Sequence, residues 1–157
     1  ELENEDVHSG EPVADLRVRA SQLRAIDVDP AFVSLAIDEF PVLFVAAACA
    51  EGATRFSGIG ELRVKESDRI GAMATGLRNL GIQVDETEDG AVVHGGRLKG
   101  GTVQSFGDHR IAMSLAIAGT VADGAVSVKQ TDAVATSFPR FVDLFRTLGM
   151  QIEETSE

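Results

Sequence analysis

The sequence predicts an α+β fold made of two copies of one structural unit, and three observations support this. Segments with the apolar spacing of helices alternate with short runs in which apolar and polar residues alternate, as in half-buried strands. Similar motifs recur at an interval of about 70 residues. The 157 residues are 44% hydrophobic and 25% charged, which is typical of one globular domain with its own core.

The internal repeat is visible in two pairs of segments. Asp38 begins an Ala-rich apolar run, and Asp108, 70 positions later, begins a similar one. The stretch 77–84 resembles the stretch 145–152, and their central glycines are 68 positions apart. Because both pairs recur at nearly the same interval, we predict a duplication. The two repeats are expected at about 12–90 and about 91–157.

The first repeat is predicted to contain strands separated by two helices. Apolar and arginine residues alternate around 16–20, which predicts a half-buried strand. The other elements are delimited by caps and turn residues: a helix from Asp38 to Gly52, a strand at 53–57, a helix from Ser67 to Gly81 and a strand pair at 82–86 and 91–94.

The second repeat is predicted to have the same order of elements. They are a strand at 102–105, a helix at 111–121 capped by Asp108, a strand at 126–128 and a helix capped by Thr136 or Ser137. The first helix of each repeat is apolar on nearly every side. We therefore expect both to be core helices surrounded by sheet.

Charge and composition narrow the classes of partner. The formal net charge of −11 argues against a nucleic acid or an acidic membrane. No stretch reaches the ~18 apolar residues of a membrane span, and no secretory signal opens the chain. The chain begins with an acidic segment and no Met, as an excised piece of a longer protein would begin.

The few cysteine and histidine residues predict a structure without disulfide or metal cross-links. The single cysteine, Cys49, lies in an apolar run, where we expect it to be buried as a small hydrophobic residue in a reducing, cytoplasmic compartment. Three histidines and one cysteine show no metal-ligand spacing. We therefore expect no metal site.

The most informative motif is the charged run 65–69, which directly precedes an amphipathic helix. The start of a helix presents unpaired N–H groups and a partial positive charge. Lys65 and Arg69 add two cations there, which favours a small anion, and Glu66 between them is a candidate proton donor or acceptor. The alternative is a solvated helix start capped by Ser67.

Polar residues also begin the other predicted helices, at 38–39, 108–110 and 136–137. If the two repeats superpose, equivalent helices point the same way and their positive ends gather on one face. Together with Lys65, Arg69 and Arg110 they would form an anion site despite the negative total charge.

Five segments carry a family resemblance: 10–16, 36–41, 61–69, 107–113 and 135–139. They include the runs Arg63-Val64-Lys65-Glu66-Ser67-Asp68-Arg69 and Gly107-Asp108-His109-Arg110. In this order and spacing they resemble the C-terminal third of the 5-enolpyruvylshikimate-3-phosphate synthase (3-phosphoshikimate 1-carboxyvinyltransferase) family. The resemblance implies the enolpyruvyl transferase fold (inverse α/β, β/α-prism), in which βαβαββ units have helices inside and sheets outside.

The resemblance also implies an activity. The family transfers the enolpyruvyl group of phosphoenolpyruvate to the 5-hydroxyl of shikimate 3-phosphate and releases phosphate, in the shikimate pathway of aromatic amino-acid biosynthesis. It needs no metal or organic cofactor. Its site lies between two domains, so the partner would be the remainder of the same enzyme chain in a monomer. We expect the fragment alone to be inactive.

Catalytic roles follow from the same resemblance, position by position. Asp38 would handle the proton of the attacking hydroxyl. Glu66 would pass a proton to and from the methylene carbon of phosphoenolpyruvate, and His109 would support Glu66 or the substrate. Such chemistry needs an acid and a base at separate points, because protonation of the carbon must precede attack by the hydroxyl.

Binding roles are implied in the same way. Asp38 and Lys65 would contact shikimate 3-phosphate, and Arg69 and Arg110 would hold the charged groups of phosphoenolpyruvate with paired hydrogen bonds. Two positions depart from many relatives and receive no substrate contact: Thr136, where a Lys is common, and Glu61, where some relatives have Asn.

Two other functions remain open from the sequence. One is the related enolpyruvyl transfer to UDP-N-acetylglucosamine, which shares the fold but does not typically carry this pair of charged motifs. The other is a non-catalytic module that binds a phosphorylated ligand. Such a binder needs Lys65, Arg69 and Arg110 but has no use for Asp38 and Glu66.

Overall fold

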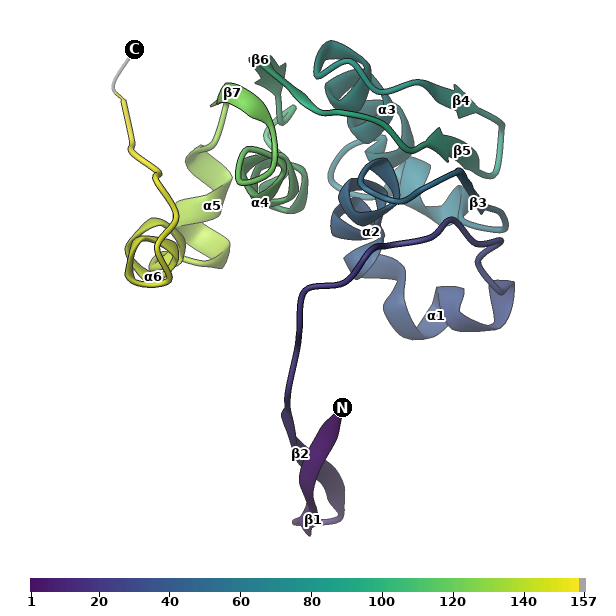
Figure 1. Cartoon of the computed structure of the whole chain (residues 1–157), viewed down its shortest axis with the longest axis vertical. Coiled ribbons are helices and arrows are strands. Elements are labelled where there is room, and N and C mark those ends of the chain that lie inside the picture. The colour runs from purple at the N-terminus through teal and green to yellow at the C-terminus, as the bar shows by residue number, and fades with distance from the viewer. Residues whose placement is uncertain (156–157) are drawn as a thin grey trace.

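The computed structural model of the chain describes residues 1–155, in which three small sheets lie beside a group of packed helices (Figure 1). Strands β1 (Leu2–His8) and β2 (Glu11–Leu16) form an antiparallel hairpin that projects from the body of the molecule. The hairpin is joined to the body by an extended segment, so it contributes little to the core.

The predicted strand around 16–20 is wrong beyond its first residue. Residues 17–20 have no strand structure. Leu16 and Val18 are 74% and 88% exposed, so the alternating apolar side chains face no buried surface. A half-buried strand requires cross-strand neighbours and an apolar layer beneath it. This stretch lies against no such layer in the part of the chain that the structure describes.

Consecutive helical segments follow from 30 to 48. They are 3₁₀ turns at Pro30–Phe32 and Ile37–Glu39, and the helices α1 (Val33–Ala36) and α2 (Phe40–Ala48). The predicted N-cap role of Asp38 is wrong. Glu39 occupies the N-cap of α2, and the Asp38 carboxylate binds the guanidinium of Arg69 instead of a backbone N–H.

The run Pro30–Ala48 also has the length and composition of a membrane-crossing helix, with a mean hydropathy of 1.8. The expectation that no stretch is long and apolar enough to span a membrane is therefore wrong for this run. Length and composition are weak evidence, because core helices and signal sequences share them. Here one 3₁₀ turn begins the run and a second one interrupts it, where Asp38 pairs with Arg69 and Glu39 pairs with Arg110.

The three-stranded antiparallel sheet has the order β3-β5-β4. Its strands are β3 (Ala53–Phe56), β4 (Val84–Glu86) and β5 (Ala91–His94). These confirm the strands predicted at 53–57, 82–86 and 91–94. β5 begins at the predicted boundary between the repeats and pairs with two strands of the first repeat, and the division into repeats stays a prediction.

Helix α3 (Arg69–Asn79) connects this sheet to the polar site. It is preceded by a 3₁₀ helix at Gly60–Val64. The amphipathic helix predicted after the charged run is confirmed, because four residues at helical spacing are fully buried: Ile70, Met73, Leu77 and Leu80. The cap is Asp68, which accepts a hydrogen bond from the N–H of Gly71, and not Ser67 as predicted.

The parallel pair β6 (Lys99–Gln104) and β7 (Asp123–Lys129) is connected through helix α4 (His109–Ala118). The predicted cap of this helix is confirmed, because the Asp108 carboxylate accepts hydrogen bonds from the N–H groups of Arg110 and Ile111. This connection places the start of α4 at the ends of two strands, close to the start of α3.

Two short helices complete the described chain: α5 (Asp132–Ser137) and α6 (Phe141–Thr147). The predicted capping by Thr136 or Ser137 is wrong, because both lie in the last turn of α5. The helix begins earlier, at Asp132, shortly after β7. It ends before Pro139, because a proline disfavours helical geometry at the residue that precedes it.

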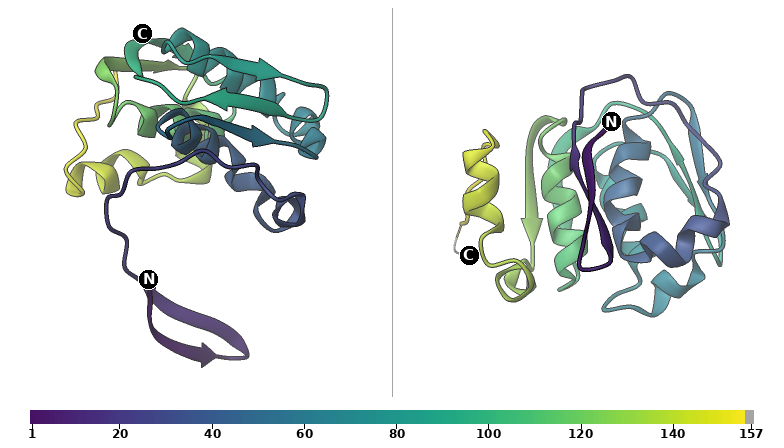
Figure 2. Two further views of the ribbon diagram at one scale, coloured as in Figure 1. Left: turned by 45° about the vertical axis from the view of Figure 1, so that its right-hand side comes forward. Right: turned by 90° about the horizontal axis from the view of Figure 1, so that it is seen from below.

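The core lies between the helices and the three-stranded sheet. The ring of Phe44 in α2 stacks on that of Phe56 in β3, with centroids 4.5 Å apart. Helices α2, α3 and α4 pack on one another, and the sheet lies along one side of α2 and α3 (Figures 1 and 2). Six of the nine residues of α2 are buried, which confirms the expected core helix, and the three-stranded sheet covers one side of it.

The uncovered side of α2 is apolar. Val42 and Leu43 are exposed there, and Cys49 is exposed at the end of the helix, so its predicted burial is wrong. Cys49 borders an open groove between α2, the end of α4 and the segment 21–23.

The link between β5 and β6 provides a test of the packing. A Cβ on Gly95 would collide with the backbone oxygen of Ala50. Gly95→Ala is therefore expected to lower the free energy of unfolding by roughly 2–4 kcal/mol, because the backbone must move to relieve the overlap. In the control Gly96→Ala, the Cβ meets the flexible end of Ile82 at 3.3 Å. Equal losses for both variants in urea denaturation would contradict this account.

Candidate active site

The site is organised around Arg69, the first residue of α3, whose side chain is 1% exposed. Its Nε donates a hydrogen bond to Oδ2 of Asp108 at 2.8 Å. Its Nη1 donates to Oδ1 of Asp38 at 2.9 Å, and its Nη2 donates to Oε2 of Glu66 at 2.6 Å. One guanidinium thus binds three carboxylates from three segments of the chain.

Asp108 is the buried partner in this group. Its carboxylate also accepts a hydrogen bond from the hydroxyl of Ser67 at 3.0 Å. Burial alone raises the pKa of Asp108, but the hydrogen bonds from Arg69 and the Arg110 N–H outweigh it, so the pKa lies below its ordinary value. For Arg69, burial lowers the pKa, and the bond and charge of Asp108 raise it overall. Both groups are therefore ionised at neutral pH.

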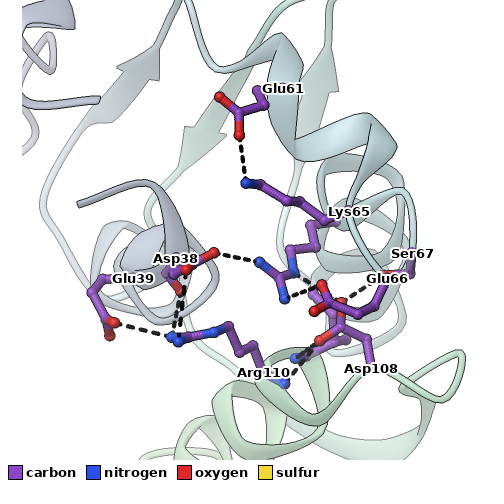
Figure 3. A network of polar contacts seen from close by, with 10 residues as sticks. Asp38, Glu39, Glu61, Lys65, Glu66, Ser67, Asp108 and Arg110 are labelled. Atoms are coloured by element: carbon purple, nitrogen blue, oxygen red, sulfur yellow. Dashed lines mark hydrogen bonds and ion pairs between the residues drawn. The ribbon is translucent and has the colours of Figure 1, made fainter. Parts of the chain in front are cut away.

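Arg110 lies on the other side of Asp38. Its Nη1 donates to the backbone oxygen of Asp38 at 2.9 Å and to Oε1 of Glu39 at 3.0 Å, while Nη2 lies 3.8 Å from Oδ2 of Asp38. A small open pocket of about 120 Å³ is bordered by these three residues and by α4. Asp38 therefore bridges the two guanidiniums (Figure 3).

The structure joins four of the six predicted site residues. Asp38, Glu66, Arg69 and Arg110 belong to one bonded network. Lys65 instead points toward Glu61 and binds its carboxylate at 2.5 Å, away from the network (Figure 3). His109 is half-buried at the start of α4, and its ring makes no hydrogen bond or ion pair with residues 1–155.

The network contains more carboxylates than guanidiniums, unlike a simple cationic pocket. The two guanidiniums of Arg69 and Arg110 are bound to the carboxylates of Asp38, Glu39, Glu66 and Asp108. An anion that binds Arg110 must compete with Glu39, whose side chain is 62% exposed and so can move away. Binding of a substrate anion by either arginine stays a prediction.

The carboxylates of Asp38 and Glu66 are exposed enough for proton transfer. Asp38 is 48% exposed and Glu66 is 56% exposed, so both can exchange protons with a bound ligand or with water. Each also keeps one oxygen on the buried guanidinium, which holds it in place. The arrangement therefore offers two orientated carboxylates beside a partly open cation, Arg110.

Sequence reasoning missed three residues of this site. The sequence predicts Asp108 and Ser67 only as caps, yet both also bind within the network. It predicts Glu39 only as a polar residue at a helix start. Its position next to Asp38 was the available signal. No local spacing indicates the link from Asp108 to Arg69, since they are 39 positions apart.

Candidate metal ligands do not cluster in the described part of the chain: no three His, Cys, Asp or Glu side chains there are placed to hold a metal ion. The carboxylates of the site are instead bound to arginines.

The lowered pKa of Asp108 predicts a specific pH dependence of stability. A carboxylate with a lowered folded pKa stabilises the fold above its unfolded value, about 3.9, and loses this contribution as pH falls through the folded value. Asp108→Asn should therefore flatten the acid part of the stability curve. At neutral pH it should cost roughly 1.5–3 kcal/mol, the range for hydrogen bonds to charged groups.

Urea denaturation between about pH 3 and 7 measures this difference. The matched control is Asp68→Asn, which alters the half-exposed cap of α3. If the parent and Asp108→Asn curves run parallel down to the acid end, the assigned ionisation of Asp108 is wrong.

Comparison with known proteins identifies the family. A sequence model of EPSP synthase (3-phosphoshikimate 1-carboxyvinyltransferase) matches residues 4–145. The chain is 56% identical over 153 residues to the 3-phosphoshikimate 1-carboxyvinyltransferase of Legionella pneumophila (strain Paris), covering 98% of this chain and 35% of the relative. The enzyme of Xanthomonas euvesicatoria pv. vesicatoria (strain 85-10) is 58% identical over 151 residues.

Solved structures agree with the sequence comparison. The 2.37 Å structure of EPSP synthase from Acinetobacter baumannii superposes with a TM-score of 0.95 at 47% identity, over 99% of this chain and 37% of that one. This likeness confirms the predicted enolpyruvyl transferase fold. The chain spans about a third of the length of the curated relatives it matches. It therefore belongs to the EPSP synthase (3-phosphoshikimate 1-carboxyvinyltransferase) family.

Proposed function

We propose that the full-length protein containing this chain transfers the enolpyruvyl group of phosphoenolpyruvate to the 5-hydroxyl of shikimate 3-phosphate, with release of phosphate. The observation that carries the proposal is the joint binding of Asp38 and Glu66 by the buried guanidinium of Arg69, beside Arg110. It combines two proton-transfer groups with a cation for the anionic substrate. Family membership supports the same reaction.

The first step is addition. Glu66 donates a proton to the methylene carbon of phosphoenolpyruvate, and the adjacent carbon becomes cationic. The 5-hydroxyl attacks that carbon while Asp38 accepts the hydroxyl proton. A tetrahedral adduct that still carries the phosphate results. The half-exposed positions of both carboxylates support these roles, because a general acid or base must reach its substrate directly.

The second step is elimination. The ionised Glu66 removes a proton from the new methyl group, a carbon–carbon double bond forms, and the carbon–oxygen bond to phosphate breaks. Phosphate leaves with the proton that Asp38 holds, so both carboxylates return to their starting forms. Proton flow therefore needs two separate groups at fixed places, and the shared guanidinium provides such places.

Cations complete the proposed site. Arg110 borders the open pocket, where it would bind phosphoenolpyruvate after Glu39 is displaced. From its buried position, Arg69 would stabilise negative charge on the same substrate. His109, at the start of α4, would support Glu66 or the substrate. Lys65 would leave Glu61 to contact shikimate 3-phosphate. Such preorganised donors stabilise charge that develops during reaction.

The remaining partners are also proposals. The rest of the protein would supply the other substrate contacts in a cytoplasmic monomer, and the 157-residue chain alone is predicted to show no turnover. The coverage of 35% of a relative's length supports this view. Neither a nucleic acid nor a membrane is proposed as a partner, given the net charge of −11.

Substitution of Glu66 tests the proposal. In the full-length protein, Glu66→Gln keeps the shape of the side chain but removes its exchangeable acid proton. Turnover, measured as phosphate release, is expected to fall by roughly 10²- to 10⁴-fold, the usual contribution of a positioned acid or base. Affinity for shikimate 3-phosphate, measured by calorimetry, should stay within about threefold of the parent because no direct contact is lost.

The control is Glu51→Gln, an exposed glutamate outside the network. It should have parental turnover. Parental turnover in Glu66→Gln would refute the proton role. A parent protein that binds shikimate 3-phosphate but never releases phosphate would favour the non-catalytic module, and release with UDP-N-acetylglucosamine as sole acceptor would favour the related transferase.

A further inference from the structure

Asp108 takes no part in the proton transfers proposed above, yet its side chain is 0% exposed and lies in the middle of the network. Its Oδ1 accepts from the N–H groups of Arg110 and Ile111 at 2.9 and 3.4 Å. Its Oδ2 accepts from the Ser67 hydroxyl at 3.0 Å and from Arg69 Nε at 2.8 Å. Because four donors occupy its two oxygens, Asp108 is not available to take a proton from a substrate.

The bond to Asp108 fixes the direction of the Arg69 guanidinium. This group is planar and its N–H bonds form a rigid fork, so an anchor at Nε also sets the directions of Nη1 and Nη2. Those two nitrogens bind Asp38 and Glu66. The anchor is buried, whereas the two carboxylates on the fork are about half exposed.

We infer that Asp108 is a positioning residue that acts through Arg69 to fix the carboxylates of Asp38 and Glu66 relative to each other. The inference rests on the function proposed above, which gives these two carboxylates the proton transfers. They come from separate segments, the turn before α2 and the loop before α3, so local chain geometry does not set their spacing. A misplaced acid or base loses much of its effect on rate.

A role in capping alone would not need the charge of Asp108. Asparagine is as good an N-cap as aspartate. Its side chain has one acceptor oxygen, however, so it can serve the backbone of α4 or Arg69 Nε but not both well, and its amide end is a donor. With that oxygen placed on the backbone N–H of Arg110, Asp108→Asn keeps the cap and removes the anchor of Arg69 Nε.

The test compares Asp108→Asn with Asp68→Asn in the full-length protein. Asp68 is a matched control because it caps α3 and has no hydrogen bond to Asp38, Glu66 or Arg69. We expect Asp108→Asn to lower kcat at least about tenfold, a part of the roughly 10²- to 10⁴-fold that positioned proton-transfer groups supply. The KM for shikimate 3-phosphate should change less than about threefold, and Asp68→Asn should be near the parent.

Three results would overturn the inference: parental kcat in folded Asp108→Asn, an effect confined to KM, or an equal loss of kcat in the Asp68→Asn control. If Asp108→Asn does not fold, Ser67→Ala decides, because it keeps the charge and removes one of the four donors. A fall in kcat of about two- to fivefold, as expected for one lost hydrogen bond, supports the inference, and parental kcat overturns it.

A second readout separates this inference from the proposed function. The Arg69 Nε–H should exchange slowly with solvent in the parent, because it is buried and bonded, and quickly in Asp108→Asn; NMR of the arginine side chains measures both. If the parent catalyses no transfer, the proposed function is wrong whatever this result. Slow exchange in both proteins would show that Asp108 does not anchor Arg69.

Discussion

The buried bond between the Arg69 guanidinium and the Asp108 carboxylate is the interaction on which the site depends. A charge taken out of water is costly unless it is paired and its other bonding positions are filled. Here both conditions hold, since Arg69 binds three carboxylates and Asp108 accepts from four donors. The pair therefore makes the region rigid, and the half-exposed Asp38 and Glu66 receive fixed positions from a part of the molecule that water does not reach.

The fold brings these residues together by aligning helix starts. Arg69 begins α3, and Asp108 caps α4, so the bond joins two helix N-termini. The helices approach closely because Gly76 of α3 has no side chain; a Cβ there would lie 2.9 Å from Cδ2 of Leu115 in α4. The parallel strands β6 and β7 are joined by α4, and they contact α3 and α4 respectively, which keeps the two helices side by side. The packing of α3 on α4 thus determines that Arg69 and Asp108 meet in the site.

Local sequence patterns correctly predicted the features that depend on neighbouring residues, such as helices and their caps. The spacing of apolar residues defined α3, and the capping preference of aspartate identified Asp108 as the start of α4. The same rules were wrong where long-range contacts prevail. Asp38 binds Arg69 instead of capping a helix, and residues 17–20 are exposed and pack on no apolar layer of the described chain. The convergence of the site followed from the repeat and the family resemblance, whereas the link from Asp108 to Arg69 had no signal in the spacing.

The most direct test of the account is a crystal structure of the full-length protein with shikimate 3-phosphate and an unreactive analogue of phosphoenolpyruvate. The account predicts that the reacting carbon lies within hydrogen-bonding reach of Glu66, the 5-hydroxyl lies beside Asp38, and Arg110 binds the analogue in place of Glu39. It also predicts that Arg69 keeps its bond to Asp108. Both ligands bound away from these side chains, with the carboxylate network unchanged, would contradict it.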